Sequence, residues 1–196
     1  AIARAQAGLR VGLMDADVDG PNVPMRMGTN APPPVVGDRI QPLLAYGVKL
    51  MSLGFLIERG QAAIWRGPIV MKIVTQFLRD VDWGTLDYLI VDLPPGTGDI
   101  AISVAQLVPS AEILVVTTPQ LAAQEVAERA GSIALQTHQR IAGVAENMSY
   151  LPCPHCGEAI DVFGAGGGQA VETVMSRGVG AEGAWRGEGA VWTMSS

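Results

Sequence analysis

Several residue types are scarce in this sequence, and each scarcity argues against a class of protein. Of 196 residues only 5% are aromatic, and 13 Lys or Arg stand against 19 Asp or Glu, for a formal net charge of −6. No run of basic residues stands out, so neither a nucleic acid nor an anionic membrane surface is an expected partner. No uninterrupted apolar stretch reaches the roughly 18 residues of a membrane span, so we expect no membrane-spanning helix in this sequence.

Cysteine is scarce too, since Cys153 and Cys156 are the only two. The first residues, AIARAQAGLR, lack the charged segment, apolar run and cleavage site of a secretory signal. They are typical of the last turns of a helix stopped by Gly8, so we expect an N-terminally truncated helix. Without an export signal, a close cysteine pair fits a reducing cytoplasm, where it more often binds a metal or acts in redox chemistry.

The apolar residues, 48% of the chain, are mostly aliphatic and fall into short runs separated by helical patterns. Apolar runs predict strands at 9–15, 48–56, 86–92, 111–119 and 141–149. Pro68 opens one predicted helix, a second runs from Asp99 to Val108, and a third covers 119–139. Strands that are apolar on both faces and alternate with helices predict a single α/β domain, whose mostly parallel sheet has helices on both faces.

Polar residues close most of these predicted strands. Ligands collect at the carboxyl ends of parallel strands, and carboxylates there suit a magnesium–nucleotide site. An aspartate that only caps a turn is the simpler explanation, and for Asp92 the two are about equally favoured. The following sequence LPPGTGD favours a loop that senses phosphate. The residues at these ends are Asp15, Asp17, Asp92, Thr117, Thr118 and Asn147.

The segment YLPCPHCGEA at 150–159 places two thiols three positions apart in a predicted tight turn. Thiolates at this spacing bind one metal or cluster together, but two sulfurs are half of a tetrahedral set. The other ligands must come from a second chain, or from His155 and carboxylates. A structural zinc half-site and a redox dithiol remain open alternatives, because the spacing favours none of them strongly. His155 is the weakest candidate ligand.

Taken together, LMDADVDGPNVP, MSLGFL, AIWRGP, VDWGTLDYLIVDLPPGTGD, VVTTPQ, GVAENMSYLPCPHCG and FGAGGG resemble the Mrp/ApbC-type iron–sulfur cluster carriers. These are P-loop NTPases with a deviant Walker A loop, related to MinD, ParA and nitrogenase iron protein. The resemblance covers residues 1–180, which we expect to form a partial P-loop NTPase domain.

The resemblance implies a role for each polar strand end in ATP and Mg²⁺ binding. Asp15 would lie near the magnesium, and Asp17 resembles the catalytic switch aspartate that orients the attacking water. Asp92 resembles the Walker B aspartate. Pro94 and Gly96 belong to the stretch that resembles the second switch, and all of these would contact the bound cofactor.

Asn147 is similar to the asparagine that reads the nucleotide base. Cys153 and Cys156 match the family's cluster ligands, so a homodimer would offer four thiolates to one bridging [4Fe–4S] cluster across its two-fold axis. The resemblance implies a carrier that exchanges clusters with a cluster-assembly scaffold and apo iron–sulfur proteins. It also implies slow ATP hydrolysis coupled to dimer geometry.

Two features depart from the family pattern. The glycine-rich GKGGVGKS/T loop is not among these residues, so we expect this chain by itself to bind ATP poorly and leave open whether it is an ATPase. Residues 181–196 are Gly- and Trp-rich, and we expect a divergent, poorly ordered tail. A ParA/MinD-like positioning ATPase and a non-catalytic remnant with structural zinc are the competing hypotheses.

Overall fold

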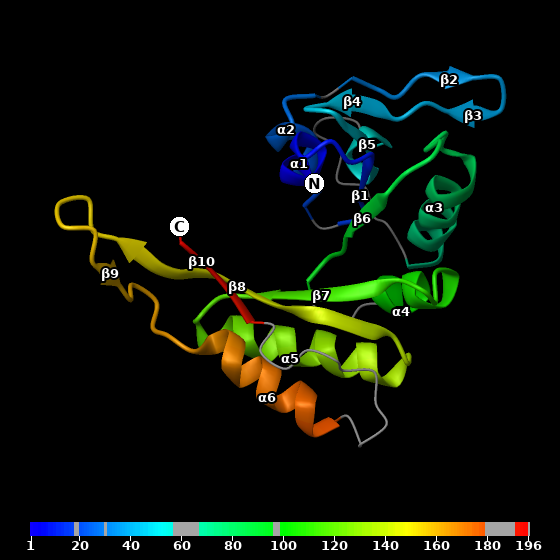
Figure 1. The fold of residues 1–196 in the computed structure, drawn as a ribbon. Coiled ribbons are helices and arrows are strands. Elements are labelled where there is room, and N and C mark those ends of the chain that lie inside the picture. Colours follow the sequence, from blue (N-terminus) through cyan, green and yellow to red (C-terminus); the bar gives the residue numbers. More distant parts are fainter. Residues whose placement is uncertain (18–19, 30, 57–66, 96–98, 179–190, 196) are drawn as a thin grey trace. The chain divides into compact units, whose positions relative to one another are not determined.

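The computed structural model describes residues 1–17, 20–29, 31–56, 67–95, 99–178 and 191–195 (Figure 1). The chain divides into two compact units, Ala1–Pro94 and Pro95–Ser196. Each unit has its own sheet.

The first unit is built on a four-stranded sheet in the order β4-β5-β1-β6. Strands β1 (Val11–Asp15), β5 (Val48–Ser52) and β6 (Tyr88–Asp92) are parallel, and β4 (Leu43–Ala45) is antiparallel to β5. A small hairpin joins β2 (Val35–Val36) to β3 (Arg39–Ile40), and a 3-10 turn, η1 (Leu53–Leu56), follows β5. The helices are α1 (Ile2–Gln6), α2 (Val23–Arg26) and α3 (Gly67–Asp80).

Strand β1 is buried along its whole length, because helices pack on both faces of the sheet. On one face Val11 and Leu13 pack with residues of α1 and α2. On the other face lies Gly12, where a Cβ atom would come within 3.0 Å of the Trp83 ring. The Trp83 indole donates a hydrogen bond to the Phe77 carbonyl of α3 at 2.9 Å, which ties that helix to this face. The close approach at Gly12 explains why this strand position carries no side chain.

The second unit is built on parallel strands in the order β10-β8-β7, with α5 and α6 packed on one face (Figure 1). The strands are β7 (Glu112–Thr117), β8 (Arg140–Pro152) and β10 (Val191–Ser195), and the short β9 (Ala159–Ile160) is antiparallel to β8. The helices are α4 (Asp99–Leu107), α5 (Leu121–Gln136) and α6 (Gly167–Gly178). Val115, Ala134, Val144 and Val171 belong to the core between sheet and helices.

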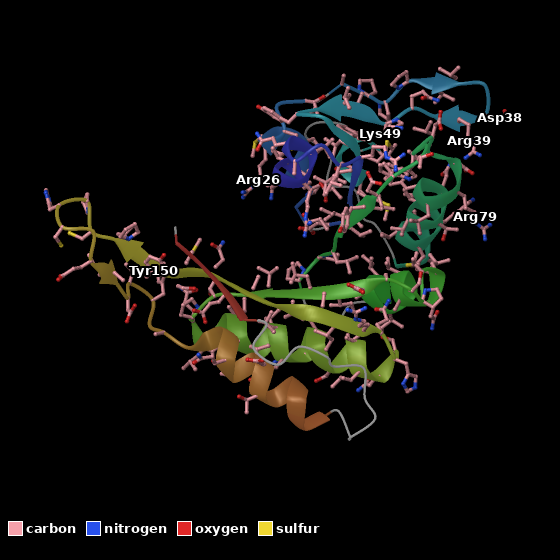
Figure 2. The ribbon with its side chains drawn as sticks, viewed as in Figure 1. Arg26, Asp38, Arg39, Lys49, Arg79 and Tyr150 are labelled. Carbon is pink, nitrogen blue, oxygen red and sulfur yellow. The ribbon has the colours of Figure 1, made fainter. Side chains whose placement is uncertain are left out.

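Strand β8 continues past the sheet and turns back through β9, so that residues 149–163 form a projecting hairpin (Figure 1). We call these residues the cysteine arm, because Cys153 and Cys156 lie in its turn. Tyr150, labelled in Figure 2, lies on the β8 side of the arm.

The predicted α/β fold with mainly parallel strands is confirmed, and five predicted strands correspond to β1, β5, β6, β7 and β8. The sequence did not predict the β2–β3 hairpin, and it ended β8 too early. Most of the segment AIWRGP at 63–68 lies outside the described residues. In the part expected to be a poorly ordered tail, the described residues Val191–Ser195 form β10.

Strands β6 and β7 are more exposed than their apolar sequences predicted. Tyr88 and Leu89 of β6 are exposed, as are Leu114 and Val116 of β7. In the described part of the chain each of these strands pairs with one neighbour only, so one edge has no strand beside it. A search of the described helices finds none with the length and apolar character of a membrane span.

An exposed ion pair joins the residues that precede β1 and β6. Arg10 donates to Asp87 from its backbone nitrogen at 2.8 Å, and from its Nε and Nη2 atoms at 3.0 and 2.6 Å. These hydrogen bonds and the guanidinium charge lower the pKa of Asp87 from 3.8 to about 2. Because the folded pKa is depressed, the stabilisation is fully present above pH 3.8 and is lost as pH falls through about 2.

We therefore expect Asp87→Asn to lower the free energy of unfolding slightly at pH 7, and to make no difference near pH 2. Urea unfolding at both pH values measures this. Glu125→Gln is the matched control, because its pairing with Arg129 spans 3.8 Å on the exposed surface of α5 and should contribute almost nothing. Equal effects of the two substitutions at pH 7 would contradict the assignment.

Candidate functional site

Three polar side chains close neighbouring strands of the first unit. In the parallel register Asp15 of β1 lies opposite Ser52 of β5 on one side and Asp92 of β6 on the other. The backbone continues this pairing one step further, where the Ala16 amide donates to the Asp92 carbonyl at 2.9 Å. The sheet therefore brings two carboxylates and a hydroxyl together at its carboxyl edge, as the strand pattern predicted for the two aspartates.

The buried Asp15 carboxylate is held by hydrogen bonds on both oxygens. Ser52 Oγ donates to Oδ2 at 2.8 Å, and the Asp17 amide donates to Oδ1 at 3.1 Å. Ser52 is itself fully buried, and its Oγ accepts a hydrogen bond from the Gly54 amide at 2.9 Å. These bonds leave the Asp15 side chain little rotational freedom.

Negative charge accumulates at this edge without an equal positive charge. Burial raises the pKa of Asp15, against the opposing effect of its hydrogen bonds, of which that from Ser52 is the largest. Asp92 is exposed to solvent at the end of β6. Partial desolvation still raises its pKa, and the charges of Asp15 and Asp17 raise it further. Arg26 of α2, labelled in Figure 2, opposes that rise. The edge is thus a place where a cation would relieve electrostatic strain.

Asp17 lies in the loop after β1 and is half-buried. Its Oδ1 accepts a hydrogen bond from the Gly20 amide at 3.3 Å. Pro94 follows β6 by two residues and is half-buried, so it lies just beyond the same edge. Gly96 is outside the described residues, as is the rest of the predicted second switch up to Gly98.

The carboxyl edge of the second unit carries another polar group of residues. Thr117 of β7 lies opposite Glu146 of β8, and both are buried. Thr118 Oγ1 is buried and has no hydrogen-bond partner among the described residues. Asn147 is half-buried, and its Oδ1 accepts a hydrogen bond from the Met148 amide at 2.9 Å. Thr118 and Asn147 each follow one member of the Thr117–Glu146 pair. An unpartnered buried hydroxyl at a strand end is a group that a polar ligand can satisfy.

The two cysteines lie in a tight turn closed by backbone hydrogen bonds. The Gly157 amide donates to the Cys153 carbonyl and the Cys153 amide to the Glu158 carbonyl, both at 2.8 Å. Gly157 has a φ of 77°, a conformation that favours glycine. Hydrogen bonds from the backbone of His155 and Cys156, and from the Cys156 thiol, lower the pKa of Cys153. The turn therefore favours a thiolate before any metal is present.

These sulfurs have few additional ligands near them. Among the described residues no group of three or more His, Cys, Asp or Glu side chains is placed to hold a metal ion. Both cysteines are free thiols, with Cys156 exposed and Cys153 partly exposed. His155 is exposed on the same turn. The described part of one chain thus offers two sulfur ligands at an accessible turn.

Apolar side chains surround this turn along the cysteine arm. Leu151 and Ile160 face each other across the β8–β9 pair, and both are exposed. Val162 and Phe163 are exposed on the returning segment. A two-stranded hairpin has little stability of its own, and clustered exposed apolar groups usually mark a contact surface.

The sequence motifs did not identify two residues of these groups, Ser52 and Glu146. Ser52 closes a strand at the same edge as Asp15, and this position could have marked it as a candidate. Glu146 is a charged residue inside the buried run of β8, which is unusual enough to draw attention. Neither position revealed its partner, because the partners are 37 and 22 residues away along the chain.

A family model described as "ParA: NUBPL iron-transfer P-loop NTPase" matches residues 1–181. Among curated proteins, the "Iron-sulfur cluster carrier protein" of Mycobacterium leprae is 58% identical over 182 residues, covering 93% of this chain and 47% of that protein. The Bacillus subtilis protein of the same name is 45% identical over 168 residues, covering 86% and 48%. The chain therefore spans about half the length of these relatives.

Solved structures give the same picture of the fold. A nucleotide-binding protein from Archaeoglobus fulgidus, in complex with ADP, matches with a TM-score of 0.74 and 36% identity, covering 88% of this chain and 68% of that one. The cell division protein MinD of Aquifex aeolicus matches with a TM-score of 0.54 and 18% identity, covering 89% and 68%, which shows a shared fold.

The hydrogen bond between Ser52 and Asp15 can be tested by truncation. Ser52→Ala leaves a buried carboxylate oxygen without its donor, so we expect a loss of about 1–3 kcal/mol in the free energy of unfolding. Urea denaturation measures the loss. Ser132→Ala is the matched control, since its Oγ only donates to the Glu128 carbonyl on the exposed surface of α5. A Ser52→Ala protein no less stable than this control would contradict the role given to Ser52.

Proposed function

Because the chain belongs to the ParA family of NUBPL-type iron-transfer P-loop NTPases, we propose that it is part of an iron–sulfur cluster carrier. Its cargo is a [4Fe–4S] cluster bound by Cys153 and Cys156, which is received from an assembly scaffold and passed to apo iron–sulfur proteins. The observation that carries this proposal is the cysteine turn, where backbone amides stabilise a thiolate at an accessible position. An accessible cluster is one that another protein can reach and remove.

The same turn supports a homodimer. Two sulfurs are half of the ligands that a cluster with four cysteine ligands takes, and a two-fold axis through the turn would supply the other two. The exposed Leu151, Ile160 and Phe163 lie on the same arm, so a second copy would cover apolar surface as it completes the ligand set. In this proposal cluster binding and dimer formation depend on each other.

ATP and Mg²⁺ are the proposed cofactors of the cytoplasmic carrier. The raised pKa values of Asp15 and Asp92 fit a cation site, since a divalent ion would favour the ionised form of both. Asp15 and Asp92 would hold Mg²⁺, Asp17 would orient water, and Pro94 and Gly96 would belong to a switch. When bound, Mg²⁺ would neutralise negative charge on the phosphate groups of ATP.

The base of the nucleotide is proposed to contact Asn147. Its amide group offers both a donor and an acceptor. The unpartnered Thr118 hydroxyl follows β7 at the same carboxyl edge of the second unit. ATP hydrolysis would then regulate how the cluster is held. That coupling is a proposal for the whole protein, of which this chain matches about half the length in its relatives.

Anaerobic reconstitution with iron and sulfide tests the cluster proposal. We expect a brown protein with broad absorption near 400 nm and about four irons per two chains, as a cysteine-ligated [4Fe–4S] cluster requires. Cys153→Ser should abolish the absorption and the iron. Ser132→Ala, whose hydroxyl lies on the exposed surface of α5 away from the arm, should retain both.

Zinc bound tightly without any cluster would instead favour the structural remnant. A reconstituted protein with one cluster per single chain would contradict the shared site, and light scattering distinguishes that case. A chain that binds neither metal would contradict the proposal for these residues.

The cation site predicts an unusual response to charge removal. Since the folded pKa of Asp92 is raised, its ionisation destabilises the folded state at neutral pH, and stability is regained as pH falls through the folded pKa toward 3.8. We expect Asp92→Asn to be more stable than the wild type at pH 7 without metal, and to lose that advantage near pH 3. Asp38→Asn, on an exposed turn, is the control, with urea unfolding as the measurement. A destabilised Asp92→Asn protein at pH 7 would contradict the electrostatic assignment.

A further inference from the structure

Glu146 bonds to residues on either side of the cysteine arm. The arm begins three residues after Glu146, and α6 begins four residues after the last residue of the arm, Phe163. At the outgoing end the Ser149 hydroxyl donates to the Glu146 carbonyl at 3.0 Å. Beyond the returning end the Gly168 amide donates to the Glu146 carboxylate. Glu146 therefore bonds to the first residue of the arm through its backbone, and to the helix that follows the arm through its side chain.

The side-chain bond lies in the interior of the second unit. Glu146 is only 3% exposed, and Gly168 is buried as well. A buried carboxylate needs hydrogen-bond donors, and an amide in the first turn of a helix also offers the positive end of the helix dipole. Hydrogen bonds to charged groups are stronger than neutral ones. This contact is consequently difficult to replace with water or with another group nearby.

The segment that reaches Glu146 has no room to shift. A Cβ atom on Gly167 would lie 2.8 Å from the Thr118 carbonyl oxygen and 2.9 Å from Gln124 Nε2. Gln124 Nε2 is itself fixed by donating to the Pro119 carbonyl at 2.7 Å. The first residue of α6, Gly167, thus packs closely against the turn between β7 and α5. The amide of the next residue, Gly168, donates to the Glu146 carboxylate.

We infer that Glu146 is the positioning residue of the cysteine arm, and that its carboxylate fixes the direction in which Cys153 and Cys156 are presented. The inference rests on the proposed function, in which two arms must meet so that four thiolates surround one cluster. A hairpin bound to its unit only by one strand would vary in orientation. Two such arms would bring their four thiolates together around a cluster less often. Asn147, the proposed contact of the nucleotide base, is the next residue along the chain, so the arm is anchored directly beside that contact.

Three substitutions of Glu146 distinguish the contribution of side-chain length from that of its charge and from the loss of the whole side chain. Glu146→Gln keeps the length of the side chain and an acceptor oxygen, whereas Glu146→Asp keeps the charge but is one methylene too short. Glu146→Ala removes both. Glu158→Gln is the matched control, because Glu158 is an exposed glutamate on the same arm. The expected order of arm mobility is Ala and Asp well above Gln, with Gln and the control close to the wild type.

Amide hydrogen exchange of the chain without cluster is the first readout. We expect the amides of residues 149–163 and 167–168 to exchange about tenfold faster in Glu146→Ala and Glu146→Asp. An increase of this size corresponds to the loss of one hydrogen bond to a charged group. Exchange at 113–117 in β7 should change much less. A residue with only a structural role would instead accelerate exchange in β7 and in the arm together. If Glu146→Ala does not fold, Glu146→Asp against Glu146→Gln supplies the same comparison.

The second readout is the rate at which the reconstituted protein loses iron to a ferrous chelator, expected to rise in the same order. Unchanged arm exchange in Glu146→Asp and Glu146→Ala, or equal effects of Gln and Ala, would overturn the role of Glu146. These outcomes are distinct from failure of the proposed function. In that case the wild type takes up no cluster, while the exchange measurement still reports whether Glu146 holds the arm.

Discussion

The parallel register of neighbouring strands is the constraint on which both polar groups of this protein depend. Parallel strands end at the same edge, so residues far apart in sequence become neighbours there. In the first unit this register sets Asp15 between Ser52 and Asp92, and in the second it sets Thr117 beside Glu146. Without it the acidic and hydroxyl side chains would be isolated turn residues with no common chemistry.

Two kinds of carboxylate show how the protein uses charge. Asp87 is exposed and paired with Arg10, and its pKa falls to about 2 because the folded state favours its ionised form. Asp15 has a raised pKa mainly because it is buried, and the exposed Asp92 has one because desolvation and the charges of Asp15 and Asp17 disfavour its ionisation. The first kind stabilises the fold, whereas ionisation of the second lowers its stability. A site of this kind is where function and stability are expected to conflict.

The cysteine arm combines a self-sufficient turn with a dependent hairpin. The turn lowers the pKa of Cys153 through its own backbone amides and the Cys156 thiol, so its hydrogen bonds are formed within residues 153–158. The hairpin that carries it exposes Leu151, Ile160, Val162 and Phe163, and the preceding Glu146 accepts a hydrogen bond from Gly168 of α6. In the proposed carrier, an accessible turn on an arm held at its base would be suited both to holding a cluster and to releasing it.

The sequence by itself determined strands β1, β5, β6, β7 and β8, helices α3, α4 and α5, the polar strand ends and the cysteine turn, because these follow from short apolar runs and local hydrogen bonds. Asp15, Asp92 and the two cysteines could all be found in this way. Only the tertiary structure decided that Ser52 holds Asp15, that Glu146 bonds to Gly168, and that Leu89 and Leu114 are exposed on edge strands. Those facts depend on which strand lies beside which, and on contacts across 37 and 22 residues, which no local pattern contains.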